Sequence, residues 1–369
     1  MDEIKKQRER TRELLLKQYY TYPQLQPEDM IKYIFQSSFG CEHLVASEDA
    51  ARAYIRREYE ALSQTGMPKV EKLDGDYSRV SLTCLNEGLD VATLTKLFCL
   101  SAQKEADGRA RAEQKLEVAN ALVNAGELPF EARAFEAALA DWRKSGYPAI
   151  HHSHIFRTAY SPAYRVIANR YTDFLSVFTA IDRLLSEGNA IVAIEGGSAS
   201  GKTTLANVLQ TVYDCNVFHM DDFFLRPEQR TPQRLAEIGG NVDRERFFEE
   251  ILQPLKKNEA VRCRRFDCST QALGEPITVP MKKLTVIEGV YSMHPMFEEY
   301  YDLAVFLEID PAYQRKRILK RNTPTLAKRF FEEWIPLENL YFSQMQIKSR
   351  CSVRVAIEEP CAENEGTPR

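Results

Sequence analysis

The sequence predicts an α/β fold for its second half, a parallel sheet flanked by helices, preceded by a mainly α-helical domain. From Ala190 onwards, short apolar runs rich in β-branched residues alternate with helical stretches, as they do where strands are buried on both faces of a sheet. Up to about Tyr171 the apolar residues instead recur at helical spacing. Because 369 residues are many for one hydrophobic core, we expect two domains, 1–175 and 176–369.

Three helices are expected in the first half. One ends at Gly126, because glycine suits the left-handed conformation that closes many helices. Its apolar face consists of Leu116, Ala119, Leu122 and Val123. A second helix is expected to begin with Asp90 or Thr93 as its cap and to stop at Gly108. The third, over 171–186, leads into the domain junction.

In the second half, apolar runs mark the expected strands. In chain order they read AIVAI, CNVFHM, LTVIEG, LAVFLEI and CSVRVAI. Their alternation with helical stretches favours a parallel sheet covered by helices on its faces.

Composition and charge exclude several function classes. A formal net charge of −4 gives no general attraction to nucleic acid or to anionic membranes. No apolar run is long enough to cross a bilayer, and the charged N-terminus lacks the apolar segment of a signal peptide. The eight cysteines show no paired CxxC spacing and are interpreted as free thiols. We therefore expect a cytoplasmic protein that binds neither membranes nor nucleic acid.

The strongest motif runs from Gly196 to Thr203 and satisfies GxxxxGK[ST], the nucleotide-binding P-loop. It follows an expected strand and opens an expected helix, which is the context that the motif requires. Glycines let backbone N–H groups converge on phosphates, and the helix N-terminus adds a favourable field. We expect Lys202 to bridge the β- and γ-phosphates of ATP and the Thr203 hydroxyl to bind Mg²⁺. The predicted ATP-binding residues are Gly196, Gly197, Ser198, Ala199, Ser200, Gly201, Lys202, Thr203 and Thr204.

Charged residues at later strand ends extend this prediction to phosphoryl transfer. Asp221 and Asp222 follow CNVFHM, where a carboxylate would take the proton of an attacking hydroxyl; we prefer Asp221 as this catalytic base. Glu288 ends LTVIE and suits Mg²⁺, with a water between them. Arg317 and Arg321 lie on one helical face and would cover the transferring phosphoryl group. The alternatives are a helix cap, a loop carboxylate paired with a lysine, and a solvated basic helix.

Together these motifs resemble the uridine kinase family of P-loop nucleoside kinases, from about Asn189 to Ile357. GGSASGKTT resembles the nucleotide loop of that family, MDDFF its catalytic aspartate segment, and VIEG the strand with its acidic residue. The resemblance implies a P-loop kinase fold and transfer from ATP, with Mg²⁺, to the 5′-hydroxyl of a nucleoside such as uridine or cytidine. The implied catalytic residues are Lys202, Asp221, Arg317 and Arg321.

The resemblance also implies where the substrate binds. Asp243, in NVD before ERFF, matches the aspartate that holds the ribose hydroxyls. Phe266 and Asp267 resemble a tyrosine–aspartate pair beside the base pocket. The expected substrate-binding residues are Asp222, Phe223, Asp243, Phe266 and Asp267. Gln314 departs from the family, which usually has a further lid arginine there; the neighbouring Arg315 is the candidate to replace it.

A histidine-rich stretch lies at the end of the first half. It contains His151, His152, His154, Arg157 and Arg165. In an extended chain His152 and His154 would point the same way and could share one ligand. Together with His43, the stretch has three open interpretations: a structural hinge with hydrogen-bonded histidines, an anion or substrate pocket, and a metal site.

Three functional hypotheses follow. The first is a nucleoside kinase with an accessory N-terminal domain, whose near neighbour is a kinase for pantothenate or a sugar. The second is a nucleotide-dependent switch or binding protein that uses its first half to engage a partner. The third adds separate chemistry in the first half. The sequence leaves open the base, the choice of ATP or GTP as donor, and homo-oligomerisation.

Overall fold

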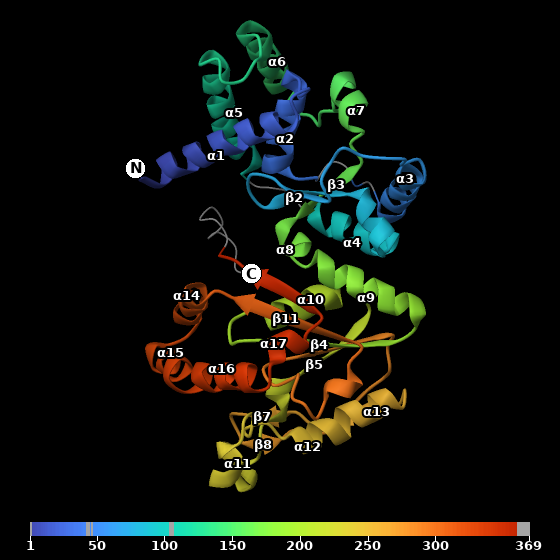
Figure 1. Cartoon of the computed structure of the whole chain (residues 1–369), viewed down its shortest axis with the longest axis vertical. Helices are drawn as coiled ribbons and strands as arrows, with labels where there is room; N and C mark the ends of the chain where they lie inside the picture. The colour runs from blue at the N-terminus through green and yellow to red at the C-terminus, as the bar shows by residue number, and fades with distance from the viewer. Residues whose placement is uncertain (1, 42–44, 46, 103–106, 360–369) are drawn as a thin grey trace. The chain divides into compact units, whose positions relative to one another are not determined.

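Figure 1 shows the computed structural model of the chain, which describes residues 2–41, 45, 47–102 and 107–359. The chain divides into two compact units, Met1–Leu175 and Ser176–Arg369, here called unit 1 and unit 2. No helix in the described part of the chain has both the length and the apolar character needed to cross a membrane.

Unit 1 is mainly helical and also contains a small antiparallel sheet that the sequence did not predict. The sheet has the order β1-β2-β3, formed by Val70–Lys72, Tyr77–Ser81 and Tyr164–Ala168. The middle strand, YSRVS, is buried throughout and lacks the apolar alternation by which a strand is recognised. The helices are α1 (Asp2–Thr21), α2 (Pro27–Phe39), α3 (Glu48–Glu60), α4 (Val91–Ser101), α5 (Gly108–Asn124), α6 (Ala132–Lys144), α7 (His154–Tyr160) and α8 (Asn169–Thr172).

The predicted ends of α4 and α5 are confirmed in part. The Asp90 side chain caps α4 by accepting a backbone N–H of its first turn at 2.6 Å. Gly126 follows α5 with a φ of +73°. The predicted apolar face, Leu116, Ala119, Leu122 and Val123, is buried. The stop at Gly108 was wrong: α4 ends at Ser101, and Gly108 opens α5, where a Cβ would lie 2.6 Å from a ring carbon of Phe39.

Unit 2 contains the predicted parallel sheet, and all five apolar runs form its strands. Its order is β12-β11-β4-β10-β5. The strands are β4 (Ala190–Gly196), β5 (Cys215–His219), β10 (Leu284–Glu288), β11 (Leu303–Ile309) and β12 (Val353–Ile357). Two small hairpins pair β6 (Val261–Cys263) with β9 (Ile277–Val279) and β7 (Phe266–Asp267) with β8 (Ala272–Leu273).

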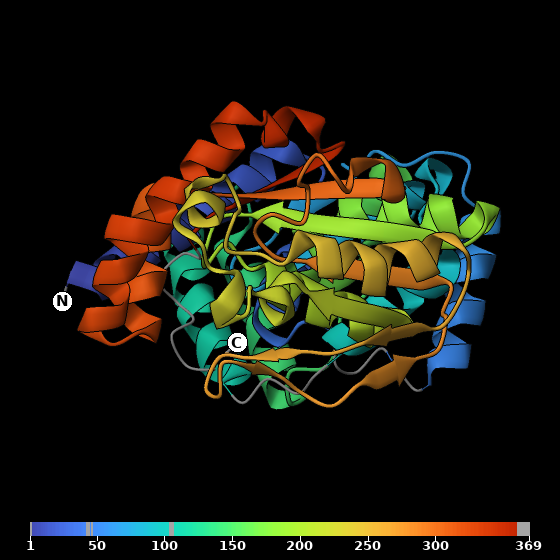
Figure 2. The same cartoon turned by 90° about the horizontal axis from the view of Figure 1, so that it is seen from below.

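Helices cover this sheet, and some of them lie beyond one end of its strands. They are α9 (Leu175–Glu187), α10 (Lys202–Val212), α11 (Pro232–Ala236), α12 (Arg244–Phe247), α13 (Gln253–Lys256), α14 (Pro311–Arg321), α15 (Pro324–Arg329), α16 (Ile335–Gln344) and α17 (Ile347–Arg350). Helices α14, α15 and α16 lie together near the end where the strand arrows point (Figures 1 and 2).

The register of the sheet brings chemical groups from separate segments to one edge. Glu288 at the end of β10 is level with Ile194 of β4 and with His219 of β5. The glycine loop therefore starts beside the ends of two further strands that carry titratable side chains, which is the edge where open α/β sheets bind ligands.

Candidate active site

The glycine loop joins β4 to α10 with a backbone that two glycines make possible. Gly196 has a φ of +147°, and a Cβ there would lie 2.6 Å from the backbone oxygen of Leu307. Gly201 has a φ of +104° and caps α10, which begins at Lys202. Both conformations are strained for residues with side chains, so the motif glycines are required by local geometry.

The side chains of Lys202 and Ser200 are placed where phosphates held by the loop would meet them. The Lys202 ammonium is nearly buried and donates to the backbone oxygens of Gly196 and Gly197 at 2.8 and 3.0 Å. Ser200 Oγ is buried and has no hydrogen-bond partner in the described part of the chain. A lysine folded into its own loop and an unsatisfied hydroxyl are groups that a phosphate would engage.

Glu288 joins the loop to the neighbouring strand β5. Its Oε1 lies 3.0 Å from Thr203 Oγ1 and 2.6 Å from His219 Nδ1. Burial raises the pKa of Glu288, but the hydrogen bond from His219 and the charge of Lys202 outweigh it, so its pKa lies below the usual value. A charged carboxylate beside the Thr203 hydroxyl suits Mg²⁺ that keeps part of its water shell. The described residues hold no cluster of three or more His, Cys, Asp or Glu side chains able to bind a metal by themselves.

His219 is a site residue that the sequence analysis missed. Its side chain is about one-third exposed, and the hydrogen bond to Glu288 raises its pKa. The signal was available, since His219 ends the predicted strand CNVFHM at the edge where Glu288 was expected.

Asp221 and Asp222 lie in the 3₁₀ turn that follows β5, Met220–Phe223. Solvent reaches the Asp221 side chain, yet surrounding protein atoms raise its pKa, Lys202 opposes the rise and Glu288 adds to it. These influences place Asp221 within electrostatic range of the ammonium expected at the phosphates. Asp222 differs, because it pairs with Arg265 at 3.3 Å.

Arg317 on α14 approaches the loop, whereas Arg321 is exposed one turn later. A Cβ on Gly201 would lie 3.7 Å from an Arg317 guanidinium nitrogen. The expectation that Arg315 replaces a lid arginine stays a prediction; its guanidinium lies over the Phe331 ring at 4.4 Å. Gln314 instead reaches the loop and donates to the Ser198 backbone oxygen at 2.8 Å.

Two buried glutamates beside the loop were also missed. Glu338 of α16 accepts from the backbone N–H of Ser198 at 2.8 Å and contacts its hydroxyl. Glu195 precedes the loop, is fully buried, and has a pKa that burial raises to about 7. Glu338 lies 140 residues after Ser198, so no local spacing in the sequence links them.

The expected nucleoside contacts are only partly accessible. Asp243 is 2% exposed; it caps α12, pairs with Arg246 at 3.4 Å and accepts from Gln229 at 3.2 Å. A substrate diol would have to displace Gln229 or Arg246. Thr204, the last predicted loop residue, is exposed on the first turn of α10.

The aromatic predictions need correction. Phe223 is 1% exposed, packs against Phe247 in the core and therefore cannot stack on a base. Phe266 is 5% exposed and lies beneath the Arg230 guanidinium, at 5.7 Å from the ring centre. Asp267 is exposed, and hydrogen bonds from Ser269, whose N–H lies 2.7 Å away, lower its pKa.

The histidine stretch of unit 1 favours the structural interpretation. His152 Nδ1 lies 2.8 Å from Asp29 Oδ1, and its Nε2 lies 2.6 Å from the Tyr164 hydroxyl. His154 is exposed on α7, so the interpretation in which His152 and His154 share a ligand is wrong. The reason is Ser153, whose side chain caps α7 and ends the extended chain between them.

The remaining members of that stretch also lack a common ligand site. Arg165 pairs with Glu58 at 2.8 Å. His151 and Arg157 are exposed. His43 lies outside the described residues.

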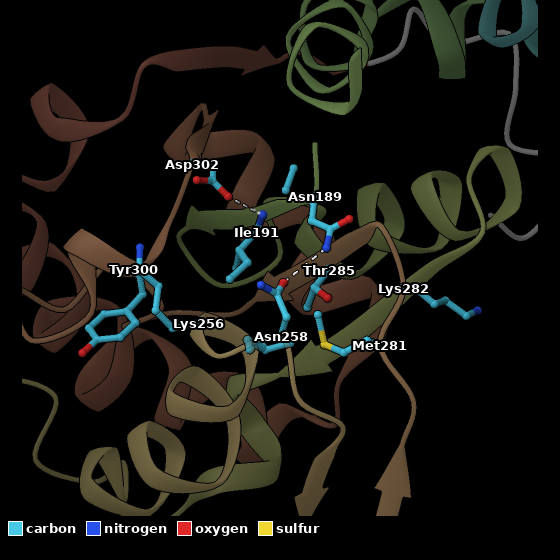
Figure 3. Close-up of a pocket in the computed structure, with 11 residues that line it drawn as sticks. Asn189, Ile191, Lys256, Asn258, Met281, Lys282, Thr285, Tyr300 and Asp302 are labelled. Atoms are coloured by element: carbon cyan, nitrogen blue, oxygen red, sulfur yellow. Dashed lines mark hydrogen bonds between the residues drawn. The ribbon is translucent and has the colours of Figure 1, made fainter. Parts of the chain in front are cut away.

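A small cavity of about 200 Å³ lies in unit 2 away from the glycine loop (Figure 3). Part of its polar lining is already paired: Asn189 donates to Asn258 at 3.3 Å, and Asp302 accepts from the Ile191 N–H at 2.8 Å. It lies where β4 begins, the end of that strand opposite the loop, and contains none of the predicted site residues.

The known structures that resemble this chain each match about half of it. No protein-family model and no curated protein matches it. A solved structure of a possible uridine kinase from Bacillus stearothermophilus is 22% identical over 49% of this chain and 99% of its own, with a TM-score of 0.37. A candidate fructose transport system kinase from a Silicibacter species is 21% identical over 46% of this chain and 90% of its own, with a TM-score of 0.36. A Thermus thermophilus protein is 16% identical over 47% of this chain and 90% of its own, with a TM-score of 0.26.

These likenesses are too distant to assign a substrate. The fold is instead evident in the chain itself, which has a parallel sheet with the loop on its central strand β4 and helices on its faces. Unit 2 therefore has a P-loop kinase-like fold, whose geometry supports nucleotide binding or phosphoryl transfer.

Proposed function

We propose that unit 2 transfers the γ-phosphoryl group of ATP, with Mg²⁺, to a small hydroxyl substrate. The observation that carries the proposal is the arrangement at the strand ends: the Lys202 loop, the Thr203–Glu288 pair and the accessible carboxylate of Asp221. Asp221 would accept the proton of the attacking hydroxyl, Lys202 and Arg317 would offset phosphate charge, and Thr203 with Glu288 would hold Mg²⁺. A raised pKa suits Asp221 to this role, because proton transfer is most effective to a base of matched pKa.

The finer part of the proposal is a nucleoside as the acceptor. It is supported by the likeness of MDDFF and NVD to uridine kinase segments and by the Asp222–Arg265 pair, which lies next to Asp221. The state of Asp243 favours a second candidate, a small alcohol without a vicinal diol, because Gln229 and Arg246 already engage its carboxylate. The cytoplasmic location belongs to this proposal too; the cysteines Cys41, Cys84, Cys99, Cys215, Cys263, Cys268 and Cys351 are free.

The test is substrate-dependent ADP release with a panel of ribonucleosides, deoxynucleosides, sugars and pantothenate. Asp221→Asn should lower transfer at least about 100-fold, because it removes the general base. Asp214→Asn is the matched control: Asp214 lies at the opposite end of β5, and its side chain is 88% exposed. ATP hydrolysis that needs no acceptor and is equal in wild type and Asp221→Asn would contradict the proposal and favour a nucleotide-dependent switch.

A further inference from the structure

Ser198, in the first turn of the glycine loop, is held through all of its polar groups by two helices from the end of unit 2. Its N–H and hydroxyl are engaged by Glu338 of α16. Its backbone oxygen accepts from Gln314 of α14 at 2.8 Å. Neither helix is close to the loop in sequence, so these contacts are tertiary.

The packing leaves little freedom at this point. A Cβ added to Gly197 would lie 3.0 Å from the Gln314 amide nitrogen and 3.5 Å from the Glu338 carboxylate. Glu338 is 5% exposed, so water does not compete for its contacts with Ser198. The two side chains therefore rest directly on the loop.

A second contact ties the same helix to the residue that precedes the loop. Tyr341, one turn after Glu338 on α16, is fully buried and donates to Glu195 Oε2 at 3.0 Å. Glu195 also accepts from the N–H of Gly196 at 2.9 Å. Helix α16 thus holds the start of the loop at Glu195 and again at Ser198.

We propose that Glu338 and Gln314 are positioning residues for ATP: they fix Ser198 so that the loop is set for the phosphates before the nucleotide binds. This inference rests on the function proposed above. A glycine-rich loop loses much conformational entropy when it is ordered, and contacts that order it in advance reduce that cost on binding. The role also accounts for the glutamine at position 314. Its neutral amide donates to a backbone oxygen at 2.8 Å and carries no charge that would attract phosphate.

The test compares Glu338→Ala, Glu338→Gln and Gln314→Ala in the full chain. The readouts are the dissociation constant of ATP with Mg²⁺, measured by calorimetry, and KM and kcat for transfer. Glutamine at 338 keeps an oxygen for the Ser198 N–H and loses the charge, so it separates positioning from electrostatics. Glu332→Gln is the charge-matched control, because Glu332 precedes α16 and its side chain is 64% exposed.

We expect Glu338→Ala to weaken ATP binding by about tenfold and Gln314→Ala by about threefold, the scale of one charged and one neutral hydrogen bond. KM for ATP should rise accordingly, with kcat and KM for the acceptor less affected. Glu338→Gln should stay close to wild type, as should Glu332→Gln.

Several results would overturn the inference. Unchanged ATP binding in both alanine variants would remove the positioning role. Tighter binding in Glu338→Ala and Glu338→Gln would mean that the carboxylate competes with phosphate instead. If Glu338→Ala does not fold, Gln314→Ala decides, because that side chain is only half-buried. Wild-type protein that binds no ATP would refute the proposed function itself, and this inference with it.

Discussion

Each unit contains a histidine paired with a carboxylate, and the two pairs differ in how much of their bonding capacity the protein uses. In unit 1, His152 lies 2.8 Å from Asp29; in unit 2, His219 lies 2.6 Å from Glu288. Both rings use Nδ1, and both carboxylates are buried. The ring nitrogen used and the burial of the carboxylate therefore do not distinguish the two pairs.

The two pairs differ in the contacts that their remaining nitrogen and oxygen atoms make. In unit 1, Asp29 also accepts from the N–H and hydroxyl of Ser153, and His152 Nε2 is engaged by Tyr164. In unit 2, the contacts of Glu288 with Thr203 and His219 both reach Oε1, and no hydrogen bond from the described part of the chain reaches Oε2. A saturated pair stabilises a fold, whereas a pair with spare capacity at a strand end can accept a ligand.

The largest effect expected from this comparison is on the stability of unit 1. Asp29→Ala should lower its free energy of unfolding by about 4 kcal/mol, because several buried donors lose their acceptor at once. The measurement is denaturant unfolding followed by Trp142 fluorescence in a Trp334→Phe background, since each unit contains one of the two tryptophans. Asp49→Ala, on exposed surface at the start of α3, is the control. A loss no larger than the control would show that the saturated pair is not structural.

The next effect is a pH dependence in unit 1. Burial lowers the pKa of His152 to about 4. As the pH falls, the unfolded chain therefore binds a proton near pH 6.5, whereas the folded unit binds it only near pH 4. Stability is therefore lost as the pH falls from about 6.5 towards 4, by up to about 3 kcal/mol. His152→Gln should remove this loss, measured with the same Trp142 reporter. An equal pH dependence in wild type and variant would contradict the assignment.

His219 should show the opposite sign and a smaller effect. Glu288 raises its pKa, so the folded unit holds the proton more tightly than the unfolded chain does. Its stabilising contribution is present below about pH 6.5 and is lost as the pH rises through the folded pKa. Trp334 fluorescence in a Trp142→Phe background reports unit 2, and His219→Gln should flatten its stability above neutral pH. The same sign as for His152 would break the comparison.

The sequence predicted unit 2 far better than unit 1, for physical reasons. Strands such as AIVAI are continuously apolar because both of their faces are buried, and the loop glycines are dictated by backbone conformation. Both features are local. In unit 1 the strand YSRVS is buried with polar side chains, its near partner β1 is only three residues long, and its other partner β3 lies far along the chain, so the apolar pattern did not identify the sheet.

The errors within the site have the same origin. A ligand shared by His152 and His154 was one open interpretation, and it assumed an extended chain, whereas the Ser153 cap starts a helix between them. Glu338 was missed because only tertiary packing brings it to Ser198. Local sequence located the glycine loop and the strand ends beside it, whereas packing determined which neighbouring side chains contact the loop.

The smallest expected effect concerns Asp243. This residue lies in unit 2, but its carboxylate is engaged by several partners, as that of Asp29 is in unit 1. Its carboxylate caps α12 and contacts Arg246 and Gln229. Asp243→Asn keeps one acceptor oxygen, so we expect a loss of about 1 kcal/mol in the stability of unit 2, reported by Trp334, with an unchanged KM for ATP. If Asp243 holds a ribose diol after displacing Gln229, the variant should also raise KM for ribonucleosides but not for deoxynucleosides. A stability loss with no change in either acceptor KM would make Asp243 a structural residue and favour an acceptor without a vicinal diol.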